Sequence, residues 1–164
     1  MGYFTDIRKE QWTTWEVKDE FRWVLLVVVL QCIQYFHCLI LAGAPREKIF
    51  TQEFLDENFK EEHEKALGYP LQKGGYPDHG SGRFIMKAGY EAWMQFNNAQ
   101  RIQVHYMESI TQILTQQLIC GLYWPMPTLV IGIIYLVGRA IFTYGYLAKG
   151  AKGRMFGAPF VLLV

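Results

Sequence analysis

The feature that most constrains this chain is an apolar run without Asp, Glu, Lys or Arg, WVLLVVVLQCIQYFHCLILAGA, which extends from Trp23 to Ala44. A helix needs about 20 apolar residues to cross the ~30 Å hydrocarbon core of a bilayer, and this run is long enough. It predicts a first membrane span over residues 22–44. We expect this helix to end near Pro45, because proline disfavours helical backbone in the residue before it.

Further segments extend this pattern to a bundle of helices. A helix is predicted over residues 91–122, which end in the apolar stretch ILTQQLICGL, and a third span over 128–148, interrupted by Arg139. Residues 45–90 form a long polar loop, in which REKIFTQEFLDENFKEEHEKAL has the composition of a short surface helix. Residues 1–20 form a polar N-terminal tail.

The final segment, residues 155–164, reads MFGAPFVLLV and is apolar but short. Ten helical residues rise only ~15 Å, about half of a bilayer, and Pro159 weakens even that helix. We therefore predict one all-α integral membrane domain over residues 1–164. It is expected to be an up-and-down four-helix bundle with a truncated fourth helix, and its first expected partners are membrane lipids.

The distribution of charge bears on partners and on orientation. The net charge is only +1, which gives no support to a nucleic-acid partner, since nucleic-acid-binding domains concentrate basic residues in a patch. Lys and Arg are plentiful in residues 45–95 and in the turn at 149–154, and they are absent from residues 123–127. The positive-inside rule then places the loop and the 149–154 turn on the cytosolic or matrix side, with the N-terminus opposite.

The cysteine and histidine pattern predicts neither disulfides nor a metal site. Cys32, Cys38 and Cys120 all fall inside apolar runs, so we interpret them as small buried hydrophobic residues. His37 has no second ligand at helical spacing, and a histidine that contacts other helices is expected there. His63 lies among glutamates, on what we expect to be a solvated helix face.

Polar residues are expected to share one face of the helix at 91–122, and we name this face the polar ridge: Asn97, Arg101, His105, Glu108, Gln112 and Gln116. Their positions advance by four, four, three, four and four, which is helical spacing. A charged group at the bilayer centre costs about 2.5 kcal/mol or more on insertion scales, so the ridge cannot face lipid. Arg139 has the same problem, and a contact with Glu108 would solve it for both.

The ridge allows two interpretations, which the pattern alone favours equally. The first is a charged cleft that accepts an anionic, polar ligand from the membrane interface. The second is a polar seam that holds helices together, because hydrogen bonds replace the missing hydrophobic driving force between helices in lipid.

FNNAQR in the second helix, the preceding GYPDHGSGRF and the later YLVGRAIFTYGY occur in an order and at spacings that resemble the MAPEG family of membrane-associated proteins in eicosanoid and glutathione metabolism. The resemblance covers roughly residues 70–160 and is strongest to its type-3 microsomal glutathione transferase branch. It implies a four-helix bundle that assembles as a homotrimer and binds glutathione between subunits. It also implies that an arginine stabilises the glutathione thiolate, the nucleophile that attacks an electrophile or a lipid peroxide.

The resemblance also assigns roles to individual residues. It implies that Arg101, His105, Glu108 and Tyr146 belong to the set that binds glutathione. It implies that Arg154, in the turn before the last segment, is the arginine that stabilises the thiolate. Glutathione is the expected cofactor if the site is retained, together with bound lipids, and no metal is expected.

The chain departs from the family pattern at several of these positions. His105 replaces an asparagine, and a neutral imidazole cannot offer the two donors and one acceptor of an amide. Phe142 replaces a tyrosine of the leukotriene-synthesising branch, and Ser109 replaces an aromatic or apolar residue. With the truncated fourth helix, these changes favour a degenerate glutathione site in a structural accessory subunit of a larger membrane complex.

The alternative is an active microsomal-type glutathione transferase or peroxidase, which would conjugate glutathione to lipophilic electrophiles or reduce lipid peroxides. Arg101, Glu108, Tyr146 and Arg154 support this second hypothesis. A structural subunit is expected among other membrane-protein subunits, such as those of respiratory complexes in the mitochondrial inner membrane. An enzyme of this family is expected in the endoplasmic reticulum or the mitochondrial outer membrane, and the two hypotheses therefore also differ in location.

Overall fold

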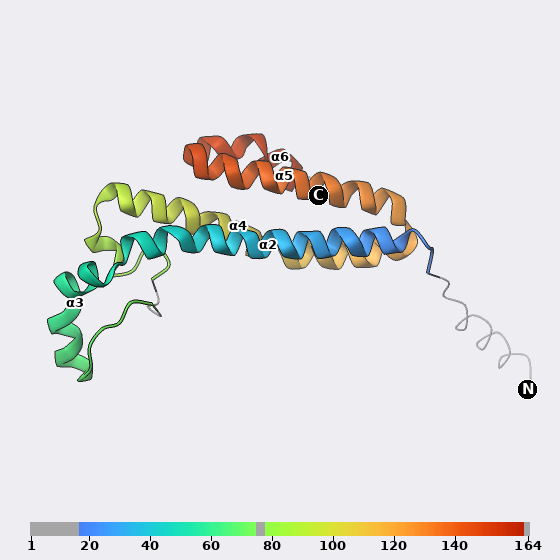
Figure 1. Cartoon of the computed structure of the whole chain (residues 1–164). Helices are drawn as coiled ribbons and strands as arrows, with labels where there is room; N and C mark the ends of the chain where they lie inside the picture. The colour runs from blue at the N-terminus through green and yellow to red at the C-terminus, as the bar shows by residue number, and fades with distance from the viewer. Residues whose placement is uncertain (1–16, 75–77, 163–164) are drawn as a thin grey trace, which may run out of the picture.

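A computed structural model describes residues 17–74 and 78–162 of the chain. These residues form helices and no strand, so the all-α fold predicted from the sequence is confirmed. The bundle consists of α2 (Phe21–Ile49), α4 (Tyr90–Tyr123) and α5 (Pro125–Lys149). Figure 1 shows α2 and α4 side by side, with α5 folded back over them after a tight turn.

The lengths of these helices suit a bilayer. Among the described residues, two helical stretches are long and apolar enough to cross a membrane, Phe21–Ile49 and Pro125–Phe156. α4 has 34 residues and therefore rises ~51 Å, which exceeds the ~30 Å hydrocarbon core. It is more polar than the other two helices because it carries the polar ridge.

Pro45 does not end α2, contrary to the prediction: the helix continues to Ile49. A proline interrupts helical hydrogen bonding, and membrane helices tolerate this where neighbouring groups bond to the affected backbone. Pro45 has no N–H, so the carbonyl that loses its helical donor is that of Leu41. The Gln100 side chain of α4 donates to the next carbonyl along the helix, that of Ala42, at 2.9 Å. Arg46 and Lys48 lie in the last turn, where basic groups interact favourably with the helix dipole.

The polar section between α2 and α4 is built around a small core of its own. Its helix, α3 (Gln52–Leu67), begins after Thr51, whose hydroxyl accepts a hydrogen bond from the N–H of Phe54. The core consists of Phe50, Leu55, Phe59, Leu71, Ile85 and Phe96. Since Phe96 belongs to α4, this core attaches α3 to the start of the bundle.

Asp78 organises the turn that leads into α4. Its carboxylate, only 1% exposed, accepts hydrogen bonds from the backbone N–H groups of Gly80, Gly82 and Ile85 at 2.9, 3.0 and 2.9 Å. Arg46 at the end of α2 donates to the backbone carbonyl of Asp78 at 2.8 Å. The loop is therefore ordered here, and it connects the end of α2 to the beginning of α4.

After α5 the chain reverses through a 3-10 helix, η2 (Gly150–Phe156), into a short helix, α6 (Ala158–Leu162). Both elements lie along α5, as Figure 1 shows, and we call them the returning segment. The structure describes this segment only as far as residue 162, so the truncated fourth helix stays a prediction.

Glycines let the returning segment approach α5 closely. A side chain at Gly153 would collide with the carbonyl oxygen of Gly145, and one at Gly157 would collide with the backbone of Phe142. Small residues of this kind allow helices in membranes to pack backbone against backbone. The positions of the residues of η2 therefore depend on these glycines.

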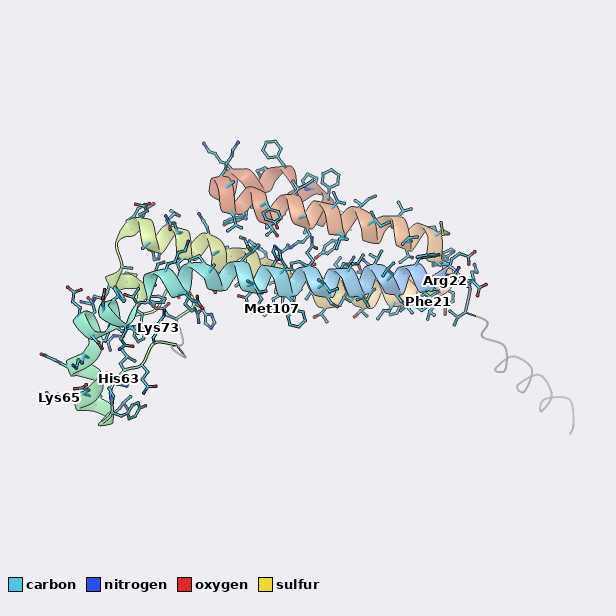
Figure 2. All side chains as sticks on the ribbon, viewed as in Figure 1. Phe21, Arg22, His63, Lys65, Lys73 and Met107 are labelled. Carbon is cyan, nitrogen blue, oxygen red and sulfur yellow. The ribbon has the colours of Figure 1, made fainter. Side chains whose placement is uncertain are left out.

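The two ends of the bundle carry different kinds of side chains. Figure 2 places Phe21 and Arg22 at one end and Lys65 of α3 at the other. Trp23 and Trp124 are exposed at the first end, in the manner of the aromatic belts at membrane–water interfaces. The α4–α5 turn thus shares one end of the molecule with the beginning of α2, while the charged loop lies at the opposite end.

Candidate functional site

A cleft of about 380 Å³ lies between α4, α5 and the returning segment, and we call it the arginine cleft. Its polar lining consists of His105, Glu108, Ser109, Gln112, Arg139 and Arg154. Phe142 and Val161 are among the apolar residues that line the remainder. The cleft therefore brings together three of the residues that the family resemblance assigned to glutathione: His105, Glu108 and Arg154.

Arg139 is almost fully buried, with 1% of its surface exposed. It donates a hydrogen bond to the carbonyl of Ile102 at 2.9 Å. Its guanidinium carbon lies 4.3 Å from the ring centroid of Tyr106 and 4.9 Å from that of Phe142, so cation–π attraction contributes on both sides. The Nε atom has no hydrogen-bond partner. The guanidinium is thus held in place, while its Nε–H donor has no partner.

Arg154 reaches the cleft from η2. Its guanidinium carbon lies 5.9 Å from the ring centroid of Tyr146, a core residue that is 6% exposed. Tyr146 therefore lies beneath Arg154 and does not line the cleft itself. The close contact of Gly145 and Gly153 sets the height of η2 on α5, and so it sets the position of the Arg154 side chain.

On the α4 side, His105 and Glu108 form a pair. The His105 Nδ1 atom lies 3.3 Å from a carboxylate oxygen of Glu108, one helical turn later. A proton on Nδ1 allows the imidazole to donate to the carboxylate in either charge state. The positive charges of Arg101, Arg139 and Arg154 also act on this imidazole, so three guanidinium groups lie in its neighbourhood.

The expected ion pair between Glu108 and Arg139 does not form. Glu108 instead pairs with His105, and Arg139 donates to the backbone of Ile102. The reason is the direction of each side chain: Arg139 enters the core of the bundle, whereas Glu108 is exposed on α4. The two residues share the lining of the cleft without direct contact.

The polar ridge turns out of the single chain. Its exposed members are Arg101, Glu108, Gln112 and Gln116. The face of α4 that packs inside the bundle carries Ile102 and Ile113, which are 0% and 6% exposed. Cys120, expected to be buried with them, is also exposed. These exposed members are therefore not fully covered by the helices of their own chain, and protein or ligand must cover them in a membrane.

Arg139 was not among the residues predicted for this site. A lone arginine in an apolar span indicates that the side chain has a polar environment. The sequence pattern does not show which groups provide that environment. Arg101 was placed in the binding set, and it lies near the cleft without lining it. The spacing of residues along α4 could not show that Arg101 lies outside the lining, because the returning segment, a separate part of the chain, closes the cleft.

The chemistry of the arginine cleft suits an anionic ligand. Two lining guanidiniums can bind carboxylates in the bidentate manner that arginine favours. A guanidinium beside a thiol also favours the thiolate, because an adjacent positive charge stabilises the charged form. In the described part of the chain, no three His, Cys, Asp or Glu residues are grouped so that they could hold a metal ion.

Comparison with known proteins gives one match. The model of the MAPEG family matches residues 23–164, which include every residue that lines the arginine cleft. No curated protein and no solved structure matches the chain. The family match, the two apolar helical stretches and the all-α fold establish an integral membrane protein, and the chain belongs to the MAPEG family.

Proposed function

We propose that the arginine cleft binds glutathione as its thiolate and presents it to lipophilic electrophiles from the membrane. The observation that carries this proposal is the shared lining of Arg139, Arg154 and Glu108 in one cleft of about 380 Å³. Glutathione has two carboxylates and one ammonium group. Two guanidiniums and one carboxylate complement these charges.

Each charged residue of the cleft has its own role in this proposal. Arg139 is fixed by its aromatic neighbours and by Ile102, so it can bind a carboxylate without first being ordered. Glu108 is exposed and can accept from the ammonium group in exchange for His105. Arg154, on the returning segment, would lie beside the thiol and stabilise the thiolate.

The reaction that follows is a nucleophilic attack. The thiolate sulfur forms a bond to an electrophilic atom of the second substrate, and the leaving group departs with the electron pair of the broken bond. Phe142 and Val161 give the cleft an apolar side, which suits an electrophile dissolved in lipid. The site would then act as a glutathione transferase or peroxidase, in the endoplasmic reticulum or the mitochondrial outer membrane.

The test uses detergent-solubilised full-length protein and glutathione at neutral pH. We expect an ultraviolet thiolate absorbance when glutathione binds, and conjugation of a chromogenic electrophile. Arg154→Gln should reduce both signals about tenfold or more, because it removes a charge-assisted hydrogen bond. Arg22→Gln is the matched control, since Arg22 is at the opposite end of the bundle (Figure 2).

Two outcomes would contradict this function. The first is the absence of a thiolate signal in the unaltered protein at saturating glutathione. The second is an undiminished signal in Arg154→Gln, which would mean that the guanidinium does not contact the thiol. A reduced signal in both arginine variants would instead report a general loss of folded protein, which circular dichroism detects independently.

A second candidate function, a structural subunit of a larger membrane complex, is favoured by the exposed polar ridge. Arg101, Gln112 and Gln116 are exposed on α4, and a membrane-spanning chain needs protein around such groups. Other subunits would supply it, as in the respiratory assemblies of the mitochondrial inner membrane. Gentle extraction and native electrophoresis test this role, and a homotrimer free of other proteins would argue against it.

A further inference from the structure

His105 of α4 is held beside Glu108 in the arginine cleft. Its Nδ1 atom lies 3.3 Å from a carboxylate oxygen of Glu108. Its ring also meets the ring of Phe142 on α5 edge to face, with centroids 5.7 Å apart and an angle of 81° between the planes. The imidazole is therefore positioned from two helices. The carboxylate stays within reach of a ligand, because 62% of the Glu108 side chain is exposed.

The imidazole and the ammonium group of glutathione need the same carboxylate. Under the proposed function, on which this inference rests, Glu108 accepts from that ammonium group inside the cleft. His105 donates to the same carboxylate when Nδ1 carries a proton. Whatever His105 contributes to the carboxylate, the ammonium group has to replace or share. His105 is thus a competitor of the ligand for Glu108.

The strength of this competition depends on the charge of His105. A neutral imidazole gives an ordinary hydrogen bond, whereas an imidazolium gives a charge-assisted one that is roughly twice as strong. The imidazolium also cancels the negative charge that attracts the ammonium group. Histidine ordinarily changes its charge between about pH 5 and pH 8, a range in which glutamate and arginine ordinarily keep theirs.

Charged groups from three elements act on His105. Glu108 and Arg101 belong to α4, Arg139 belongs to α5 and Arg154 belongs to η2. Glu108 is the one anion in this set, so a protonated His105 pairs with Glu108. The added positive charge also attracts the carboxylates of a ligand, together with the guanidiniums. A measurement must therefore separate the effect on the ammonium group from the effect on the carboxylates.

We propose that His105 is a specificity-determining residue, whose charge sets how strongly the arginine cleft recognises the ammonium group of its thiol ligand. While His105 is neutral, the cleft prefers glutathione to an acidic thiol of the same shape without the amino group. Once His105 is protonated, it occupies Glu108 and this preference weakens. The asparagine of the family pattern at this position cannot gain a charge, so the dependence on pH comes from the histidine of this chain.

The test compares two ligands, glutathione and glutaryl-cysteinyl-glycine, which is glutathione without its amino group. Both carry the thiol and two carboxylates, so the ratio of their dissociation constants reports on the ammonium group and cancels the general attraction of anions. Isothermal titration calorimetry on full-length protein in detergent gives both constants at about pH 7 and about pH 5. We expect the preference for glutathione to be about fivefold smaller at the lower pH, as a difference of one hydrogen bond requires.

Three variants identify the group that takes up the proton. His105→Asn removes the imidazole and keeps a polar side chain, so its preference should be equal at the two pH values. Should His105→Asn not fold, His105→Gln serves the same purpose. Glu108→Gln should lose the preference at both pH values, because the carboxylate is gone. His79→Asn is the matched control: His79 is exposed in the loop before α4 and does not line the cleft, so the dependence on pH should persist.

A preference that is the same at both pH values in the unaltered protein would overturn the role of His105, and the binding of both ligands would still support the proposed function. A dependence on pH that persists in His105→Asn would also overturn this role, because another group would then take up the proton. If neither ligand binds at either pH, the proposed function fails, and this inference fails with it.

Discussion

Gln31 and Gln34 of α2 donate to the carbonyls of Gly132 and Leu136 on α5 at 3.2 and 2.9 Å. The Tyr106 hydroxyl of α4 donates in turn to the amide oxygen of Gln34 at 2.9 Å. Hydrogen bonds of this kind hold membrane helices together, since burial of apolar surface provides little preference for protein over lipid. At the scale of residues, the glutamines of α2 therefore form a polar seam inside the bundle.

Asp78 provides a residue-scale prediction outside the membrane. The Asp78 carboxylate accepts hydrogen bonds from three backbone N–H groups. In Asp78→Asn the amide NH2 replaces one carboxylate oxygen, so at least one of these N–H groups faces a donor and loses its acceptor. We expect a loss of about 1–3 kcal/mol in the free energy of unfolding. Thermal unfolding in detergent measures it, with the exposed Asp56→Asn as control. Equal melting temperatures for the two variants would contradict this role.

The exposed pair of Glu62 and Arg83 predicts a dependence on pH. Arg83 donates two hydrogen bonds to the Glu62 carboxylate, at 3.0 and 2.9 Å, and holds the pKa of that carboxyl below its ordinary value of 4.5. Since the folded state has the lower pKa, the pair contributes stability above pH 4.5 and loses it as the pH falls through the folded-state pKa. The contribution is small because water screens the pair.

The measurement for this pair compares melting temperatures of the unaltered protein and Arg83→Met between about pH 6 and pH 3. We expect a small difference at the upper end that shrinks toward the lower end as Glu62 becomes protonated. Lys65→Met, which removes a different exposed charge from α3, is the control for net charge. A difference that stays constant over the range would show that Arg83 acts by packing alone.

At the scale of elements, the returning segment depends on backbone contact with α5. In Gly153→Ala the new methyl group meets the carbonyl oxygen of Gly145, which cannot move without disturbing α5. Overpacking of this kind costs about 1–3 kcal/mol. It also displaces η2, so under the proposed function the glutathione thiolate signal should fall with the melting temperature.

The matched control is Gly43→Ala in α2. A Cβ atom there meets nothing within 4 Å, and alanine favours helix over glycine by roughly 0.5–1 kcal/mol, so this variant should be as stable as the unaltered protein or more so. A stable Gly153→Ala variant with full thiolate signal would mean that the returning segment can shift without moving Arg154.

The sequence predicted the elements of this fold better than it predicted their contacts. Apolar runs and helical spacing indicated helices close to α2, α4 and α5, because those signals are local. The end of α2 was placed too early, because the helix around Pro45 contacts segments that are distant in the sequence, through the bonds of Gln100 to Ala42 and of Arg46 to Asp78. The ridge was correctly expected to share a face, yet its outward direction depends on which side of α4 packs, which spacing alone does not fix.

The arginine cleft shows the same limit at the level of the site. His105 and Glu108 are one turn apart, so their pairing follows from the spacing of the helix. Arg154 joins them only because glycines bring η2 against α5, and Arg139 joins them from a third direction. Resemblance to a family could propose Arg154, whereas the residues themselves gave no local reason to group it with Arg139.

At the scale of the whole molecule, the charged loop between α2 and α4 and the α4–α5 turn, which has no Lys or Arg, lie at opposite ends of the bundle (Figure 1). α3 lies at one end of the bundle, and the α4–α5 turn with the start of α2 lies at the other, as Figure 1 shows. Gly150, where η2 begins, lies near Asn98 in the first part of α4, which places the 149–154 turn toward the α3 end. The positive-inside rule predicts that this end faces the cytosol or matrix.

This topology predicts the outcome of cysteine labelling in sealed vesicles. In a chain whose three cysteines are replaced by alanine, single cysteines are introduced as Lys65→Cys, Lys152→Cys and Met126→Cys. A membrane-impermeant maleimide should label the first two from the same side and the third from the opposite side, because α4 and α5 are each expected to cross the bilayer once between them. All three should react after the vesicles are permeabilised, which controls for accessibility. Labelling of Lys65→Cys and Met126→Cys from the same side would mean that α4 does not span the membrane, and the polar ridge would then need no covering partner.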